Sequence, residues 1–408
     1  MKEFEQCTLP NGIRLIHRYK NGVEVSHCGL IINAGSRDEG NSEQGLAHYI
    51  EHCLFKGTQK RKAYHVLSRL DNVGGELNAY TSKEETAIYA SFMSAHYERA
   101  MELIVDITFR ASYPEKEIAK EKEVIIDEIH SYMDSPAEQI FDEFEEQVFA
   151  GHSIGRNILG TVESVRGLTR TNILDFVHKR YRTDQMVFAS VGSLPFEKVR
   201  KLAMKHLTHM HLSDEPVDRV AFDRYTPLHK EVKRDTHQVH YVLGAPAYDY
   251  AHDRKRAMVL LTNVLGGPGM NSRLNLNIRE KHGIAYNIEA HYQPYTDTGL
   301  FTVYLGTDLS LLNRSKRLLR AELRKLREKK LGTAQLHQAK QQLIGHIALA
   351  QESGSSLMLA LGKSALLYDR VDTTEEIFRE VETITASDLL EIANEMFDER
   401  RMSSLTFL

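Results

Sequence analysis

The sequence feature that most limits the possible folds is a weak two-fold internal repeat, in which each copy takes up about half of the chain. A shift of 211 positions along the 408 residues places HQVHYVLGAPA, which begins at His237, over SHCGLIINAGS, which begins at Ser26 (237 − 26 = 211). In both segments an apolar run leads into a turn of small residues and then into a helix of similar length. The same shift brings the apolar run 301–305 close to the run 90–93. Two related segments of this size predict an α+β protein with two similar domains, each a mainly antiparallel sheet with packed helices.

The first half carries its own turn and periodicity signals. Two Asn-Gly pairs, at 11–12 and 21–22, accompany the short apolar runs of residues 12–34 and predict two strands that pair as a hairpin. The other elements expected in this half are a helix over 42–56 with Ser42 as its N-cap, two strands within 76–93, an amphipathic helix over 115–133 and a buried strand within 183–192.

A polar segment falls close to the midpoint of the chain. Residues 206–225 are weakly periodic and are broken by Pro216, as expected of a linker. We therefore expect a first domain at 1–205 and a second, homologous domain at 226–408.

Composition argues against several classes of protein. The net charge of −4 and the pI near 6.6 give no electrostatic reason to expect a nucleic-acid or membrane partner. The three cysteines (Cys7, Cys28 and Cys53) include no CxxC pair, which fits a reducing compartment. The N-terminal residues lack the apolar core of a signal peptide, and no apolar stretch approaches the ~18 residues of a membrane span. We therefore expect a cytoplasmic protein.

Residues 48–52, HYIEH, form an HxxEH motif within the expected helix. Residues at i and i+4 share a helix face, so His48 and His52 can bind one ion, and Glu51 leans toward the same face. Two neutral histidines and a third protein ligand leave a zinc coordination position for water, whose pKa the metal lowers toward ~7. The motif reverses the order of HExxH and keeps its chemistry. Because the chain contains 20 histidines, the motif also arises by chance on helices whose histidines only pack or cap. A metal site at this motif therefore requires a third ligand from elsewhere in the chain.

The helix expected over 115–133 offers that ligand. Its apolar stripe consists of Ile118, Ile125, Ile129 and Tyr132. Glu121 and Glu128 fall in this stripe, two helical turns apart on the same face. Carboxylates in an apolar stripe are expected to be paired or metal-bound, because burying them bare is costly. One of the two glutamates is therefore expected to bind the metal and the other to orient a histidine.

At these residues the sequence resembles the insulinase (pitrilysin) family of zinc peptidases, the inverzincins, in its bacterial half-length form similar to the mitochondrial processing peptidase type. The resemblance runs nearly end to end. The matching segments are TLPNGIRLI, GLAHYIEHCLFKGTQKR, NVGGELNAYTSKEETAIYA, EKEVIIDEIHSYMDSP, HSIGRNILGTVESVRGLT and SRLNLNIREKHGIAYNI. Ser153 and Thr183 stand where proline is usual in the family, and Tyr49-Ile50 replaces Phe-Leu. None of these departures touches an expected ligand.

The resemblance implies a role for individual residues. Glu128 aligns with the third zinc ligand, and Glu121 aligns with the acid that supports the site. Arg279 and Tyr286, seven residues apart, match an arginine and a tyrosine that hold a substrate carbonyl and stabilise the tetrahedral intermediate. The family's substrate-binding strand edge, to which an extended peptide adds by main-chain hydrogen bonds, is matched by Asn78, Ala79, Tyr80 and Thr81.

The internal repeat assigns different tasks to the two domains. The 211-residue shift carries the HxxEH residues onto Val259, Thr262 and Asn263, so the second domain is expected to lack a zinc site and to contribute Arg279 and Tyr286. The resemblance implies that full-length members carry four such domains as two facing halves. A two-domain chain is therefore expected to form a homodimer.

The sequence thus predicts a metalloendopeptidase that binds Zn²⁺ through His48, His52 and Glu128. Glu51 is the expected general base for zinc-bound water, and the expected substrates are unstructured peptides or presequence-like segments. Two alternatives stay open: a non-catalytic structural or binding homologue, and a catalytic subunit of a hetero-oligomeric peptidase.

Overall fold

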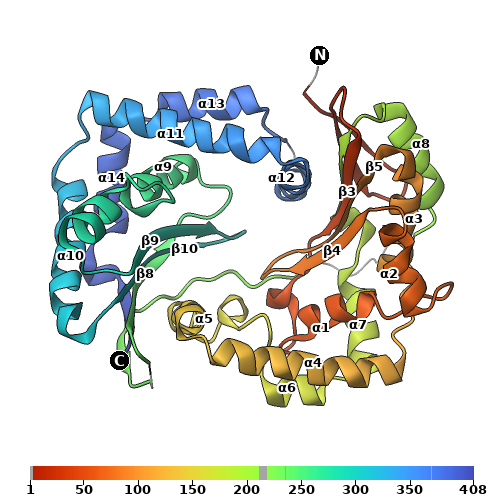
Figure 1. The fold of residues 1–408 in the computed structure, drawn as a ribbon, viewed down its shortest axis with the longest axis horizontal. Helices are drawn as coiled ribbons and strands as arrows, with labels where there is room; N and C mark the ends of the chain where they lie inside the picture. The colour runs from red at the N-terminus through yellow and green to blue at the C-terminus, as the bar shows by residue number, and fades with distance from the viewer. Residues whose placement is uncertain (1–2, 211–217, 235, 369) are drawn as a thin grey trace. The chain divides into compact units, whose positions relative to one another are not determined.

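The computed structural model describes residues 3–210, 218–234, 236–368 and 370–408. The chain forms two compact units, whose elements are labelled in Figure 1. The first unit comprises Met1–His130, Arg156–Arg219 and Leu349–Val371. The second comprises Ser131–Gly155, Val220–Ala348 and Asp372–Leu408. Each unit therefore combines segments from both halves of the sequence.

The first unit is built on a six-stranded sheet with the order β1-β2-β6-β3-β5-β4. β2 and β6 run parallel, and all other neighbours run antiparallel. The strands are β1 (Glu5–Thr8), β2 (Arg14–Tyr19), β3 (Val25–Ile32), β4 (Glu76–Thr81), β5 (Thr86–Met93) and β6 (Met186–Gly192). All seven residues of β6 are buried, as expected of a central strand that is covered on both faces.

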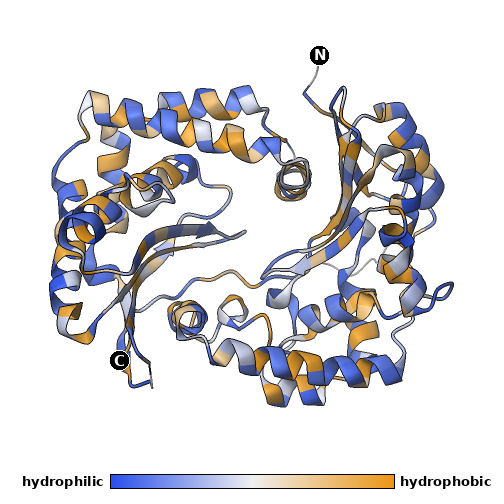
Figure 2. Ribbon diagram, viewed as in Figure 1, coloured by the Kyte–Doolittle hydropathy of each residue, from blue (hydrophilic) through white to orange (hydrophobic). Residues whose placement is uncertain are grey.

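Most helices of the first unit pack on one face of this sheet and enclose its larger core. These helices are α1 (Leu46–Leu54), α2 (Ala63–Asp71), α3 (Tyr97–Arg110), α4 (Glu115–Met133), α6 (Val162–Gly167), α7 (Arg170–Arg180) and α8 (Phe196–His206). Apolar and polar residues alternate along them, as Figure 2 shows for α4. This pattern places one apolar stripe toward the sheet and leaves the polar side in water.

A helix from the second half of the sequence, α12 (Gly354–Leu367), covers the other face of the first sheet. Met358 and Leu361 of α12 belong to one apolar cluster with Ile31 of β3 and Ala189 of β6. Gly362 allows this close approach, because a Cβ there would lie 2.4 Å from Cδ1 of Ile31 and 3.0 Å from Cβ of Ala189.

The second unit has a five-stranded sheet with the order β7-β11-β8-β10-β9. Its strands are β7 (His229–Val232), β8 (Val239–Ala247), β9 (Asn287–Pro294), β10 (Gly299–Thr307) and β11 (Ser403–Phe407). The helical segments of the main core are α9 (Lys255–Gly266), the π-helical turn Asn275–Glu280, α10 (Leu312–Glu328), α11 (Thr333–Glu352), α13 (Thr374–Thr383) and α14 (Ala386–Met396). A helix from the first half of the sequence, α5 (Pro136–Val148), packs on the opposite face through Ile140, Phe144 and Val148.

The two sheets share one topology, which confirms the predicted α+β fold with two similar domains. Without β1, the order β2-β6-β3-β5-β4 matches β7-β11-β8-β10-β9 strand for strand. The first pair is parallel in both sheets and the remaining pairs are antiparallel. The repeat extends to the helices that follow: α4 and α5 correspond in order to α11 and α12.

The predicted domains at 1–205 and 226–408, with a linker at 206–225, describe two homologous halves of the sequence, and these boundaries stay a prediction. The compact units follow this division except that α5 lies in the second unit and α12 in the first. At the end of the expected linker, Arg219 pairs with Asp38 at 2.8 Å and is largely buried. Residues 211–217 of the linker, including Pro216, lie outside the described residues.

The predicted pairing of two strands as a hairpin within 12–34 is wrong. β2 and β3 both form, but β6 lies between them and pairs with each. The Asn11-Gly12 turn instead joins β1 to β2, which are antiparallel. Nothing in a local turn signal reports that a strand some 170 residues later inserts between the two expected partners.

The predicted N-cap of the first helix is also wrong. α1 begins at Leu46, and its N-cap is Gly45, whose φ of 87° is in the left-handed region. A Cβ at this position would lie 2.5 Å from the carbonyl oxygen of Leu159, so a larger residue does not fit. No helix in the described part of the chain has the length and apolar character needed to cross a membrane.

Candidate metal centre

A buried carboxylate holds the N-terminus of α1. Glu39 accepts hydrogen bonds from the backbone N–H groups of Gly45, at 3.0 Å, and Ala47, at 2.8 Å. These are among the N–H groups that an α-helix leaves without an internal partner. Burial raises the pKa of Glu39 to about 8, and the two backbone hydrogen bonds oppose that shift. Glu39 thus fixes the start of the helix that carries the HxxEH motif.

His48, His52 and Glu128 come together, as the predicted ligand set requires. The two histidines occupy successive turns of α1, with ring centroids 4.6 Å apart, and Glu128 comes from α4. Oε2 of Glu128 lies 3.9 Å from Nε2 of His48 and 3.6 Å from Nε2 of His52. One potential ligand atom from each residue lies within 4.8 Å of the others. It is the one such group of three among the residues that the structure describes.

The chemistry of these donors fits zinc. Two imidazole nitrogens and one carboxylate oxygen form a ligand set that leaves a tetrahedral ion one open position. Burial, with a contribution from His52, lowers the pKa of His48 to about 4. His48 is therefore neutral at pH 7 and has the free lone pair that binds a metal. The nitrogen of His48 that faces Glu128 is Nε2. The other ring nitrogen, Nδ1, is buried and has no hydrogen-bond partner among the described residues.

Glu121 lies behind His52. Its Oε2 is 3.3 Å from Nδ1 of His52, while its Oε1 pairs with Nζ of Lys56 at 2.7 Å. A carboxylate at Nδ1 holds the N–H tautomer there and leaves Nε2 free for a metal. The contact thus has the geometry of the supporting role predicted for Glu121. A bond from the Tyr49 hydroxyl to the carbonyl of Ile118, at 2.5 Å, also ties α1 to α4.

Glu51 of α1 is partly buried and lies near Thr81 of β4. Burial raises its pKa, while the nearby Thr81 and His52 lower it and Glu128 raises it further. The Thr81 hydroxyl makes no hydrogen bond of normal geometry in the described part of the chain. A carboxyl with a raised pKa beside a candidate metal centre has the character of a group that takes and returns a proton.

The predicted substrate-binding residues occupy the edge of the first sheet. β4 pairs with β5 along Glu76–Thr81 and is the last strand in the sheet order. α1 packs against β4, which places this strand beside the helix that carries His48 and His52. The Tyr80 hydroxyl donates to Glu85 at 2.9 Å. Because no described strand pairs with the outer edge of β4, this edge presents unpaired main-chain groups next to the candidate metal centre.

Arg279 and Tyr286 lie in the second unit. Arg279 belongs to the π-helical turn and is exposed. Tyr286 comes just before β9, and its hydroxyl donates to Asp308 at 3.2 Å. Val259, Thr262 and Asn263, the repeat counterparts of the HxxEH residues, lie on α9. Their side chains lack the imidazole and carboxylate groups of the first unit.

Sequence reasoning missed two supporting residues, Glu39 and Lys56. Lys56 follows His52 by four residues, so its place beside Glu121 could have been inferred by extending the helical face. Glu39 gave no such signal, because it belongs to a loop and reaches the helix through tertiary structure.

Two protein-family descriptions match the chain. Residues 14–162 match the description "Insulinase (Peptidase family M16)", and residues 167–343 match "Peptidase M16 inactive domain". The first match contains every predicted zinc ligand, and the second contains Arg279 and Tyr286.

Curated relatives match over nearly their full length. An uncharacterized zinc protease of Bacillus subtilis is 30% identical over 398 residues, which cover 97% of this chain and 96% of the relative. One from Rickettsia bellii is 30% identical with 99% and 98% coverage, and one from Streptomyces coelicolor is 32% identical with 97% and 87% coverage.

Two solved structures share the fold. A peptidase M16 inactive domain from Pseudomonas fluorescens superposes with a TM-score of 0.93 at 18% identity, covering 99% of this chain and 97% of that one. A protease from Helicobacter pylori superposes with a TM-score of 0.91 at 21% identity, with full coverage of both chains.

Proposed function

Because the chain belongs to the insulinase family of peptidases (peptidase family M16), we propose that it is a zinc-dependent endopeptidase that hydrolyses unstructured peptides or presequence-like segments. The observation that carries the proposal is the convergence of His48, His52 and Glu128 within 4.8 Å, with Glu51 on the same helix. A metal-ligand set with a carboxylate of raised pKa on the same helix favours a catalytic role over a purely structural one.

When bound, zinc supplies Lewis-acid activation of the attacking water and the scissile carbonyl. Glu51 accepts the proton of that water and delivers it to the leaving amine. Burial suits Glu51 to both tasks, because it raises the pKa of the carboxyl toward the working pH. Glu121 holds the tautomer of His52, and Lys56 neutralises the buried charge of Glu121.

The substrate binds as an added strand on β4. Residues Asn78, Ala79, Tyr80 and Thr81 offer main-chain hydrogen bonds that any extended peptide can accept and donate, with little dependence on its sequence. An unstructured segment can adopt this extended conformation without unfolding first, so unstructured peptides are the favoured substrates. Arg279 and Tyr286 donate hydrogen bonds to the developing oxyanion.

The purified protein tests the proposal directly. Its zinc content is measured, and a pool of random peptides is incubated with it before and after chelation, with zinc added back. We expect about one zinc per chain and cleavage that chelation abolishes and zinc restores. A chain that binds zinc without cleaving any peptide would be the non-catalytic homologue, or a subunit that needs a different partner. Cleavage that survives full removal of metal would contradict the proposal.

A further inference from the structure

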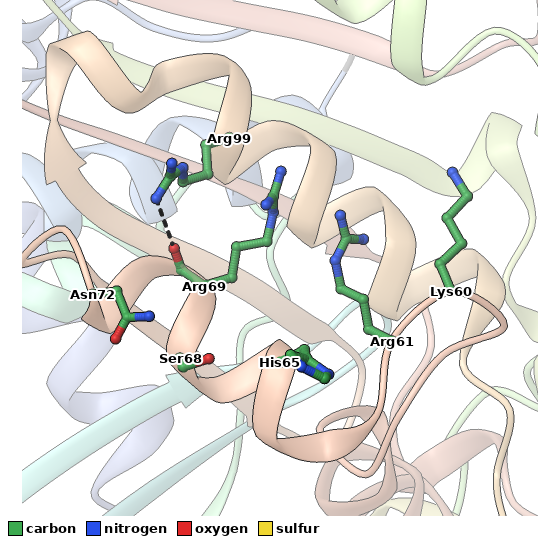
Figure 3. A pocket seen from close by; sticks show the side chains of 7 residues that line it. All are labelled: Lys60, Arg61, His65, Ser68, Arg69, Asn72 and Arg99. Carbon is green, nitrogen blue, oxygen red and sulfur yellow. Dashed lines mark hydrogen bonds between the residues drawn. The ribbon is translucent and has the colours of Figure 1, made fainter.

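A second polar site lies in the first unit, between α2, α3 and the loop before α2. It is an open pocket of about 450 Å³ whose charged lining residues include Lys60, Arg61, Arg69 and Arg99. Figure 3 shows the side chains of Lys60, Arg61 and Arg69 extending in the same general direction. No aspartate or glutamate lines this pocket in the described part of the chain. None of its lining residues belongs to the candidate metal centre or to β4.

Two of the four cations are paired with acids of α3, the buried Asp106 and the partly buried Glu102. Arg61 pairs with Glu102 at 2.8 Å and with Asp106 at 2.5 Å, and Arg69 pairs with Glu102 at 3.0 Å. Lys60 and Arg99 make no ion pair with any carboxylate that the structure describes. The acids therefore orient Arg61 and Arg69, while the charges of Lys60 and Arg99 remain uncompensated.

The loop that carries Lys60 and Arg61 is fixed before any ligand arrives. Thr58 accepts hydrogen bonds from the backbone N–H groups of Lys60, at 3.1 Å, and Arg61, at 3.0 Å, and its own hydroxyl donates to Asp106 at 2.7 Å. On the other wall, Arg99 donates to the carbonyl of Arg69 at 3.3 Å, the dashed line in Figure 3. Cationic groups held in place lose little conformational entropy when they bind an anion.

From this arrangement we propose that the pocket binds a small anion with at least two phosphate groups, such as pyrophosphate or a nucleoside diphosphate. Guanidinium groups bind phosphate oxygens in a bidentate fashion, and a lysine adds a point charge. Ser68 of α2 and Asn72, the C-cap of that helix, add neutral polar groups to the lining. The charged and polar lining disfavours an apolar ligand, because such a ligand would desolvate these cations without replacing their hydrogen bonds.

Binding is tested by titration calorimetry of the intact protein with inorganic pyrophosphate, with ADP and with a hexaglutamate peptide. The variant is Lys60→Gln with Arg99→Gln, which removes the two uncompensated charges and leaves the Arg61–Glu102–Asp106 network intact. The control is Arg166→Gln with Lys179→Gln, which makes the same change of charge at two exposed residues of α6 and α7. Circular dichroism checks that all three proteins are folded. All three keep the zinc ligands, so any contact between a phosphate and the metal is common to them.

We expect pyrophosphate to bind the wild-type and the control protein alike, and the Kd to rise at least about tenfold in the Lys60→Gln, Arg99→Gln variant. Equal affinity for ADP and pyrophosphate would assign the site to the diphosphate alone, and tighter binding of ADP would assign it to a nucleotide. An unchanged Kd in the variant, absence of binding to the wild type, or hexaglutamate binding as tightly as pyrophosphate would overturn the proposal.

Discussion

Glu51 combines two properties that a general base needs, a raised pKa and a position one residue from a candidate ligand. We expect Glu51→Gln to retain zinc and to lower kcat at least about 100-fold, because the amide keeps the shape of the side chain but cannot accept the proton. Zinc content and cleavage of a fluorogenic peptide are the measurements. Glu123→Gln, at an exposed position of α4, is the control and should leave both unchanged. Near-normal cleavage by Glu51→Gln would remove Glu51 from the mechanism.

The two glutamates of α4 differ in their distance from the candidate metal position. Glu128 lies within 4 Å of both histidine Nε2 atoms, whereas Glu121 contacts Nδ1 of His52. Glu128→Gln should therefore abolish most zinc binding, and Glu121→Gln should weaken zinc affinity by about 10–100-fold. Competition with a chromogenic chelator measures both. If Glu121→Gln were the more damaging change, the roles of the two residues would have to be exchanged.

The candidate ligands could be proposed from the sequence because helical spacing relates the members of each pair, although nothing in the spacing relates α1 to α4. His48 and His52 are one turn apart on α1, and Glu121 and Glu128 are two turns apart on α4, where Glu121 is buried and Glu128 is 44% exposed. The seven-residue spacing predicts that both glutamates lie on one helix face, so it did not indicate which of them is the metal ligand. The family resemblance favoured Glu128, and the distances to the two histidines favour it as well. Glu39 could not be found by spacing, because a loop delivers it to the helix N-terminus.

Among the elements, β6 determines how the first sheet is assembled. It pairs with β2 and with β3, and His17 of β2 lies opposite Ser190 of β6. His17 is fully buried, with Nδ1 3.0 Å from the Ser190 hydroxyl and Nε2 2.8 Å from the carbonyl of Leu194. Tyr97 of α3 completes the network through the Ser190 hydroxyl. The sequence shows that each strand exists, but a polar network among residues this far apart leaves no periodic signal.

This network predicts a pH-dependent loss of stability. Burial lowers the pKa of His17 to about 4, against an ordinary value of 6.5, so the unfolded chain takes up a proton first as pH falls. The contribution of neutral His17 to the free energy of unfolding is therefore fully present above pH 6.5 and is lost as the pH falls toward 4. Between pH 7 and pH 5 this loss amounts to about 2 kcal/mol. Urea unfolding of the chelated protein at the two pH values measures the loss. His17→Gln, which cannot titrate, should lose about 2 kcal/mol less over the same interval; equal losses would contradict the assignment.

The packing of α12 on the first sheet depends on Gly362. Its Cα lies so close to β3 and β6 that the side chain of Gly362→Val would overlap Ile31 and Ala189. We expect that variant to lose about 1–3 kcal/mol of unfolding free energy. Gly345→Val on α11, where a Cβ would meet nothing within 4 Å, is the matched control and should change stability by less than about 0.5 kcal/mol. Equal urea midpoints for the two variants would show that α12 tolerates a larger residue.

At the scale of the whole molecule, the repeat was visible in sequence but the exchange of helices was not. The 211-residue shift aligned β3 with β8 and α1 with α9, because each pair keeps the same apolar pattern. α5 and α12 each carry apolar residues that need a sheet to cover, but neither sequence indicates which of the two sheets that is. Only the packing of Phe144 on the second sheet and Met358 on the first distinguishes the two possibilities.

The division of labour between the repeats suggests how the working enzyme is assembled. The candidate zinc ligands belong to the first repeat, whereas Arg279 and Tyr286 belong to the second. Tyr286 is 57% exposed and donates to Asp308, so its hydroxyl is accessible to a substrate carbonyl once that bond is released. We propose that the chain acts as a homodimer with two-fold symmetry, in which one protomer's Arg279 and Tyr286 complete the partner's zinc site.

Mixing two inactive variants tests this proposal. Glu51→Gln lacks the base and Tyr286→Phe lacks the oxyanion donor, so each should cleave peptides poorly alone. If active sites form across the interface, a heterodimer contains one intact site, made from the Glu51 of one chain and the Tyr286 of the other. Random exchange of equal amounts should then restore about a quarter of wild-type activity, because about half of the dimers are mixed and each has one of its two sites intact. Sites completed within one chain predict no recovery, since each chain then carries its own defect. Size-exclusion chromatography with light scattering provides the control, because a wild-type chain that is fully active as a monomer would exclude the shared site.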